Sequence, residues 1–335
     1  MTSITRINRS TFFISLAAFA IAGLLLPMVA NRGVVFLGGV VAINMVYGIA
    51  FNFAFQKAGI LSFGNAMFVA AGAYTTGYLV TQVPQIPFLM VILLSGLSGA
   101  ILAMITGLLA LRRSSGVYFA VITLAVGELI HVLVTKLTFL GRNDGLVGVY
   151  RPTLNFGLFE IDLGQGNAYY YFILVVCLLL IAGLWVVWSN RFGRSLQTVK
   201  SDEMRSGFLG TDTDRRKLQA LVISGAVTAL GGALFAPWAQ IVTPDLAHWS
   251  QSTKPLLFAL LGGTSTFFGP AVGAVLFGFL EYSTRTLVGI SDLLTGGLLL
   301  AVVLAVPGGV LGLIIRLTRI RRSGRTEGRL AEDRT

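Results

Sequence analysis

The strongest constraint on the fold is a series of nearly uncharged apolar runs that are about as long as a bilayer is thick. A helix needs roughly 20 apolar residues to cross a hydrocarbon core about 30 Å thick, and runs such as 34–55 and 86–111 reach that length. Charged residues make up 12% of the chain, against roughly 25% in soluble domains. The sequence therefore predicts an all-α protein that crosses a membrane many times.

Nine apolar segments can be delimited, and one of them, 255–282, is interrupted by GGTSTFFGP. This interruption predicts either a tenth crossing or a pair of half-helices. Ten crossings also place both ends of the chain on the cytoplasmic side, where basic residues accumulate. We therefore expect about ten transmembrane helices (nine or ten), some of them broken, in a single domain over residues 1–335. The segments are 12–30, 34–55, 59–80, 86–111, 117–135, 168–189, 218–239, 255–282 and 292–306.

The formal net charge of +11 reflects membrane topology and does not indicate nucleic-acid binding. Basic residues concentrate in the loop 190–217 and in the tail 316–335, which carries seven arginines. Both segments are expected in the cytoplasm. The first apolar run is longer than the apolar core of a signal peptide, so we interpret it as a retained helix. The single cysteine, Cys177, excludes an internal disulfide.

Residues 59–80 open with turn-forming residues where lipid-facing ones would be expected. Ser62, Gly64 and Asn65 precede an apolar, glycine-containing stretch. Irregular backbone at membrane depth is tolerated where it lines a cavity, and a helix start there presents N–H groups that suit a carboxylate. We hypothesise that a half-helix begins here beside a substrate path, with Ser62 or Asn65 as its cap. The alternative is that these small residues only permit tight helix packing.

A faint internal repeat accompanies this segment. Residues 62–66 (SFGNA) and 267–271 (FFGPA) each head a glycine-containing apolar stretch, one in each half of the chain. Interrupted hydrophobic segments at matching places in two halves are typical of transporters built from repeats, sometimes inverted ones. The similarity supports this interpretation weakly, because it spans few residues.

Other polar residues within the apolar runs have two interpretations each. Asn44, Tyr47, Asn52 and Gln56 lie on roughly one face of the predicted helix, where they either line a path or join helices. Glu128 and His131 are three apart on a helix and form either a proton relay or a structural pair. An unpaired carboxylate at membrane depth is unfavourable, so Glu128 is expected to have a partner.

The loop 190–217 contains a signature of one short exposed helix. Ser201, Asp202 and Glu203 are typical of a helix start, and Gly210 fits a left-handed stop after Leu209. A short helix is marginal in water, so docking on a partner would explain its persistence. An ordinary solvated loop is the alternative.

Enzymatic motifs are missing from the sequence. The phosphate-binding pattern GxxxxGK[ST] does not occur, nor do GxSxG, HExxH or CxxC. We therefore expect neither a catalytic residue nor a metal or cofactor bound by this chain. If transport consumes ATP, another polypeptide must bind it.

The loop and the segment after it resemble the LivM-like permease subunits of ABC importers for branched-chain, hydrophobic amino acids. The resemblance covers about residues 37–312. It implies a permease domain whose loop 190–217 couples to an ATPase, although Arg205 and Ser206 replace a family Ala-Ala pair. The matching positions are Ser62–Ala66, Gly72–Tyr74, Tyr118–Ala125 (including Tyr118 and Thr123), Gly193, Arg194, Leu196, Asp202, Glu203, Leu209, Gly210, Leu261–Gly263, Gly269 and Pro270.

This resemblance implies a heteromeric complex in a bacterial inner (plasma) membrane. The implied partners are a second homologous permease, two cytoplasmic ATPases that bind ATP and magnesium, a periplasmic substrate-binding protein and membrane lipid. Related permeases imply urea, short amides and aromatic or other carboxylates as alternative substrates. Two other functions remain open: a proton-coupled secondary transporter that uses Glu128 and His131, and a membrane scaffold that does not transport.

Overall fold

The computed structural model describes residues 9–111, 116–155, 160–284, 296–297, 300 and 308–312. Within this part of the chain, six helical stretches are long and apolar enough to cross a membrane: Phe12–Val29, Arg32–Lys57, Phe88–Leu111, Val117–Lys136, Ala168–Ser189 and Thr213–Ala239. The chain is therefore a multi-pass helical membrane protein. The expected total of nine or ten crossings stays a prediction, since the segment 292–306 and the tail 316–335 fall largely or wholly outside the described residues.

The apolar runs form helices because backbone polar groups in lipid must bond within their own segment. The α-helices are α1 (Arg9–Val29), α2 (Arg32–Asn52), α3 (Asn65–Gln82), α4 (Phe88–Leu111), α5 (Val117–Lys136), α6 (Ala168–Ser189), α7 (Arg191–Ser201), α8 (Glu203–Phe208), α9 (Thr213–Ala239), α10 (Trp249–Gly262) and α11 (Gly269–Thr284). A π-helix, η1 (Phe53–Lys57), extends α2, and three 3₁₀ helices are η2 (Thr138–Leu140), η3 (Arg142–Asp144) and η4 (Pro244–Ala247).

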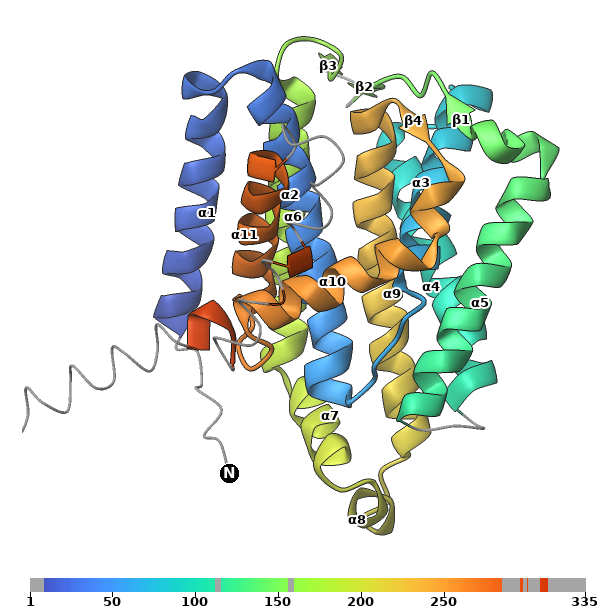
Figure 1. Ribbon diagram of the computed structural model, residues 1–335, viewed down its shortest axis with the longest axis vertical. Helices are drawn as coiled ribbons and strands as arrows, with labels where there is room; N and C mark the ends of the chain where they lie inside the picture. Colours follow the sequence, from blue (N-terminus) through green and yellow to red (C-terminus); the bar gives the residue numbers. More distant parts are fainter. Residues whose placement is uncertain are drawn as a thin grey trace, which may run out of the picture.

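The long helices run roughly parallel to one axis of the molecule, and α10 lies across them (Figure 1). Helices α7 and α8 lie at one end of the bundle, and four short strands lie at the other, which we call the strand end (Figure 1). The strands are β1 (Leu146–Val147), β2 (Thr153–Asn155), β3 (Glu160–Asp162) and β4 (Ile241–Val242). No pattern in the sequence predicted them. They pair antiparallel as β1 with β4 and β2 with β3.

Helices α3, α4 and α9 form the centre of the bundle through close backbone packing. A Cβ atom at Gly72 of α3 would collide with the carbonyl of Ala229 in α9, and one at Gly232 of α9 would collide with the carbonyl of Val69. Small residues at helix interfaces allow such approach, which favours association through van der Waals packing in lipid. This packing holds α3 against α9 although α3 has only 18 residues.

The apolar segment 255–282 forms two helices, as its interrupted sequence predicts. Helix α10 ends at Gly262, Gly263 adopts a left-handed φ of +110°, and α11 begins at Gly269. The two helices pack against each other: a Cβ at Gly273 would collide with the carbonyl of Phe258. The pair Gly269 and Gly273 therefore serves helix packing.

The two copies of the faint repeat occupy similar places in the fold. Residues 62–66 contain the start of α3, and residues 267–271 contain the start of α11. Each motif thus begins a short helix of 18 or 16 residues that follows an irregular connection.

Candidate functional site

The predicted half-helix begins where an irregular stretch enters the bundle. After the π-helix η1, Gly59 turns the chain with a φ of +72°, and residues 59–64 have no helical structure before α3 starts at Asn65. The Ser62 hydroxyl accepts a hydrogen bond from the Gly64 N–H (3.2 Å), and the Thr123 hydroxyl of α5 accepts one from the Phe63 N–H (3.1 Å). These bonds satisfy backbone groups that water does not reach.

The cap of α3 differs from the prediction that Ser62 or Asn65 provides it. The residue that precedes the helix is Gly64, which makes no side-chain cap bond. The Ala66 N–H donates instead to the hydroxyl of Ser252 in α10 (2.8 Å). This N–H group is therefore occupied by protein and is not free to bind a carboxylate.

Gly64 supports the packing alternative. A Cβ atom on Gly64 would lie 2.5 Å from the carbonyl oxygen of Thr123, so a side chain there would push α3 away from α5. Ser62 is buried as well. These two residues hold the start of α3 in place and do not line the cavity described next.

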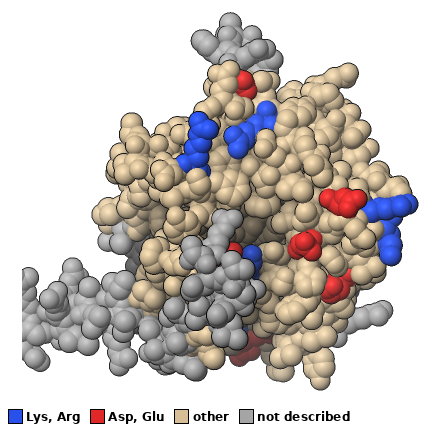
Figure 2. Space-filling view, turned by 45° about the horizontal axis from the view of Figure 1, so that its top comes forward, with Lys and Arg blue, Asp and Glu red and all other residues tan. Residues whose placement is uncertain are grey.

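A polar cavity of about 490 Å³ lies between α2, α3, α9, α10 and α11. The predicted residues Asn44 and Asn65 line it, and so does Tyr47. Figure 2 shows the strand end turned forward, with a hollow near its middle and charged side chains of both signs at its rim. The other lining residues are Phe36, Leu37, Val40, Val69, Phe235, Leu246, Gln251, Lys254, Pro255, Glu281 and Tyr282.

Three other residues predicted for a substrate path lie elsewhere. The Asn52 side-chain amide donates to the Thr266 carbonyl (3.2 Å) and joins α2 to the turn between α10 and α11. Thr123 is fully buried at the α3–α5 contact. Tyr118 is 77% exposed on the outer surface of α5, so its position does not support the expected role. The polar stripe of α2 thus serves both interpretations: Asn44 and Tyr47 line the cavity, and Asn52 joins helices.

Sequence reasoning missed two charged residues of the cavity, Lys254 and Glu281. Lys254 precedes Pro255 inside α10, and Glu281 lies in the last turns of α11. An ionisable residue within an apolar segment marks a functional site by default. That signal was present for Glu281, which lies inside the apolar run 255–282, whereas Lys254 directly precedes this run.

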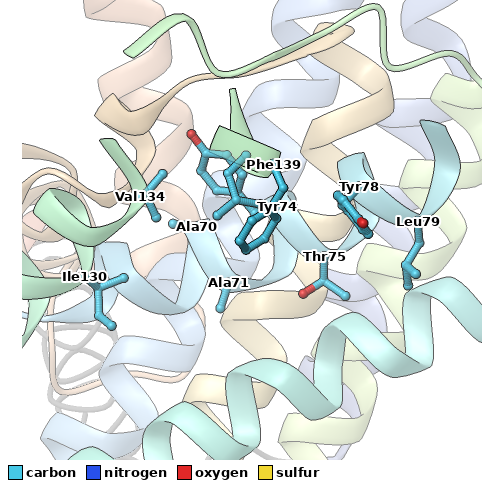
Figure 3. A pocket seen from close by; sticks show the side chains of 10 residues that line it. Ala70, Ala71, Tyr74, Thr75, Tyr78, Leu79, Ile130, Val134 and Phe139 are labelled. Carbon is cyan, nitrogen blue, oxygen red and sulfur yellow. The ribbon is translucent and has the colours of Figure 1, made fainter. Parts of the chain in front are cut away.

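A second groove, of about 320 Å³, lies between α3 and α5 and is mostly apolar. Figure 3 shows Tyr74, Thr75 and Tyr78 of α3 on one side of it and Ile130 and Val134 of α5 on the other. It contains no charged residue among its lining side chains. The cavity around Asn44 and Asn65 is therefore the stronger candidate for a polar solute.

Glu128 and His131 both bind the connection between α9 and α10. The Glu128 carboxylate accepts a hydrogen bond from the Trp249 N–H at the start of α10 (2.9 Å). The Nδ1 atom of His131 lies 3.0 Å from the Pro244 carbonyl oxygen of η4, at hydrogen-bond distance. Both side chains thus attach α5 to this connection, which matches the structural interpretation.

The loop 190–217 forms two helices, α7 and α8. The Asp202 carboxylate caps α8 by accepting from the Arg205 N–H (2.9 Å), and Gly210 follows in the left-handed conformation with a φ of +79°. The short exposed helix of the sequence prediction is therefore confirmed. Ser201 differs from the prediction: it ends α7, where its hydroxyl donates to the Gln197 carbonyl.

The tip of α8 exposes large apolar side chains. Met204, Phe208 and Leu209 are 75%, 86% and 80% exposed, at the end of the bundle away from the strands (Figure 1). An apolar surface on a short polar loop is typical of a protein-protein contact. Leu209, one of the residues predicted to couple to a partner, thus lies in this exposed apolar surface.

Polar contacts attach α7 and α8 to the membrane-spanning helices. Glu203 forms an ion pair with Lys217 in α9. The Lys200 ammonium donates to the carbonyl (3.1 Å) and side-chain oxygen (3.2 Å) of Gln56 in η1, and partial burial lowers the pKa of Lys200. A displacement of α8 would therefore reach both α2 and α9.

Broken helices around a polar cavity inside a multi-pass bundle define a membrane transport protein. The family comparison is more specific: the model of the family "Branched-chain amino acid transport system / permease component" matches residues 33–307, so the chain belongs to this family.

Curated relatives agree with this assignment. The chain is 28% identical over 348 residues to the "High-affinity branched-chain amino acid transport system permease protein LivM" of Salmonella typhimurium (97% of this chain, 80% of the relative). It is 27% identical over 328 residues to the LivM protein of Escherichia coli K12 (91% and 75%). The LivH permease of Escherichia coli K12 is 27% identical over 125 residues (37% and 40%). No solved structure matches the chain.

Proposed function

We propose that this chain is the membrane-spanning permease subunit of an ATP-driven importer for branched-chain amino acids in a bacterial inner membrane. The observation that carries the proposal is the family match over residues 33–307. The relatives named LivM, of which this chain covers most of the length, support the same assignment. The chain itself catalyses no reaction.

In this proposal the substrate path passes through the polar cavity. Asn44 and Asn65 line it and supply hydrogen bonds to the substrate. Ser62, Gly64, Asn52 and Thr123 fix the helix starts and turns that form its walls. The α7–α8 end is positively charged and therefore faces the cytoplasm, in accordance with the positive-inside bias. The strand end, toward which the cavity lies, then faces the periplasm.

The helix α8 is the contact for a cytoplasmic ATPase. Asp202 and Gly210 define its ends, Glu203 attaches it to α9, and Leu209 belongs to its exposed apolar tip. The further partners are a second permease, which the relatives named LivH represent, a second ATPase and a periplasmic binding protein. ATP and magnesium bind the ATPases.

The test is to purify the tagged chain from native membranes and to assay uptake after reconstitution. Co-purification of two ATPases and a second permease, with ATP-dependent leucine uptake that requires a binding protein, is the expected result. A chain recovered alone that takes up solute without ATP would contradict the proposal and favour a secondary transporter. Intact assembly without any uptake would favour a scaffold.

A further inference from the structure

The cavity lining includes one cationic and one anionic side chain, and neither has an ion-pair partner among the residues that the structure describes. Lys254 of α10 and Glu281 of α11 both line it. In the part of the chain that the structure describes, the ion pair within 4 Å is Lys217 with Glu203, so Lys254 and Glu281 neutralise neither each other nor another described residue. The lining of one cavity thus carries two opposite charges that do not form an ion pair with each other.

The remaining wall of the cavity is apolar on one side. Phe36, Leu37 and Val40 of α2 lie one helical turn or less apart, and Val69 and Leu246 face the same space. A volume of about 490 Å³ falls within the range of small-molecule sites, about 300–1,000 Å³. The cavity thus offers a cation, an anion and an apolar surface to one small solute.

We propose that Lys254 binds the carboxylate, Glu281 the ammonium group and the apolar wall the side chain of a zwitterionic α-amino acid. This inference rests on the proposed function and extends it, because it assigns selectivity to residues of the permease itself. The zwitterionic substrate supplies a counter-ion to each of the two charges. Urea, short amides and monocarboxylates would leave at least one of the two charges uncompensated.

A diazirine analogue of leucine tests this assignment in the purified complex with its partner subunits. After illumination, mass spectrometry is expected to find the label on peptides of α2, α3 or α10. Lys254→Gln and Glu281→Gln are each expected to reduce labelling about tenfold or more, since each removes a hydrogen bond to a charged group. Lys136→Gln and Asp144→Asn change charges that do not line the cavity and should leave labelling unchanged.

Competition on the wild-type complex tests the same assignment without any variant. Unlabelled leucine should suppress labelling, whereas 4-methylpentanoate, which lacks the ammonium, and 3-methylbutylamine, which lacks the carboxylate, should each compete about tenfold more weakly. Equal competition by either analogue, label-free cavity peptides, or unchanged labelling of both charge variants would overturn the assignment. ATP-dependent leucine uptake by the same wild-type preparation shows separately whether the proposed function holds.

Discussion

The Ala66 N–H in the first turn of α3 donates to the Ser252 hydroxyl of α10 over 2.8 Å, across 186 residues of sequence. Both groups are buried. This bond joins the start of one interrupted segment to the other interrupted segment. The cavity lies between these two segments, so its width depends on that bond.

We expect Ser252→Ala to destabilise the chain by about 1–3 kcal/mol, because it leaves a buried N–H without an acceptor. A lower melting temperature of the detergent-purified complex would report this loss. Thr253→Ala is the matched control, since the Thr253 hydroxyl is exposed and donates to the Ser250 carbonyl within α10. An equal melting temperature for Ser252→Ala and wild type would contradict the expectation.

Gly64→Ala is expected to impair assembly, because its Cβ would lie 2.5 Å from the Thr123 carbonyl oxygen. Overpacking of this kind costs about 1–3 kcal/mol. The amount of folded complex, measured by size-exclusion chromatography with a fluorescent fusion, checks it. Gly183→Ala in α6 is the control, because nothing lies within 4 Å of a Cβ at that position. Normal assembly and uptake of Gly64→Leu would contradict both the packing interpretation and the path interpretation of this residue.

Glu128→Gln is expected to leave uptake nearly unchanged at every pH between 5 and 8 (about the range over which histidine titrates). The amide oxygen of glutamine still accepts from the Trp249 N–H. Glu128→Ala removes the acceptor at the start of α10 and should cost about 0.5–2 kcal/mol of stability, as for other helix caps. Uptake by proteoliposomes in a pH series measures the first effect, and the melting temperature of the detergent-purified complex measures the second. If uptake by the glutamine variant lost the pH dependence of wild-type uptake, the result would support the proton-relay interpretation of Glu128.

Leu209→Asp is expected to weaken binding of the ATPase without unfolding the chain. Leu209 is 80% exposed, so a carboxylate there meets water in the isolated chain but an apolar partner surface in the complex. Truncation or polar replacement of a central interface residue costs about 2 kcal/mol or more. Co-purification of the ATPase, normalised to the permease, gives the readout.

The control for this prediction is Val147→Asp in β1, which places a carboxylate on an equally apolar, exposed residue at the strand end. It should leave ATPase recovery unchanged. Equal ATPase recovery with Leu209→Asp and with wild type would show that the tip of α8 is not the docking surface. Glu203→Arg is less specific, since it also breaks the ion pair with Lys217.

Local signals in the sequence predicted much of this fold. Run length and low charge predicted the long helices, GGTSTFFGP predicted the break between α10 and α11, and the series from Asp202 to Gly210 predicted α8. Each of these depends on neighbouring residues and on the choice between water and lipid. The position of α10 across the bundle depends on tertiary packing, and no local pattern predicted it.

The candidate site was less predictable because its residues come together only in the folded chain. Asn44 and Asn65 were expected near a path, and the cavity does include them. Lys254 and Glu281 come from two helices whose packing on α2 the sequence does not reveal. Tyr118 was selected from a family motif alone. Its outward direction follows from the rotation of α5 about its own axis, which the packing of the bundle determines.

Cys177, the single cysteine of the chain, is buried in α6, and buried structural thiols are inert toward labelling reagents. The natural chain is therefore nearly ready for paired spin labels, without prior removal of a reactive background thiol. Cysteines introduced at Thr198 of α7 and Ser283 of α11, both exposed, would place one probe at each end of the bundle. Their distance distribution, recorded with and without nucleotide, would report how far the two ends move relative to each other during turnover.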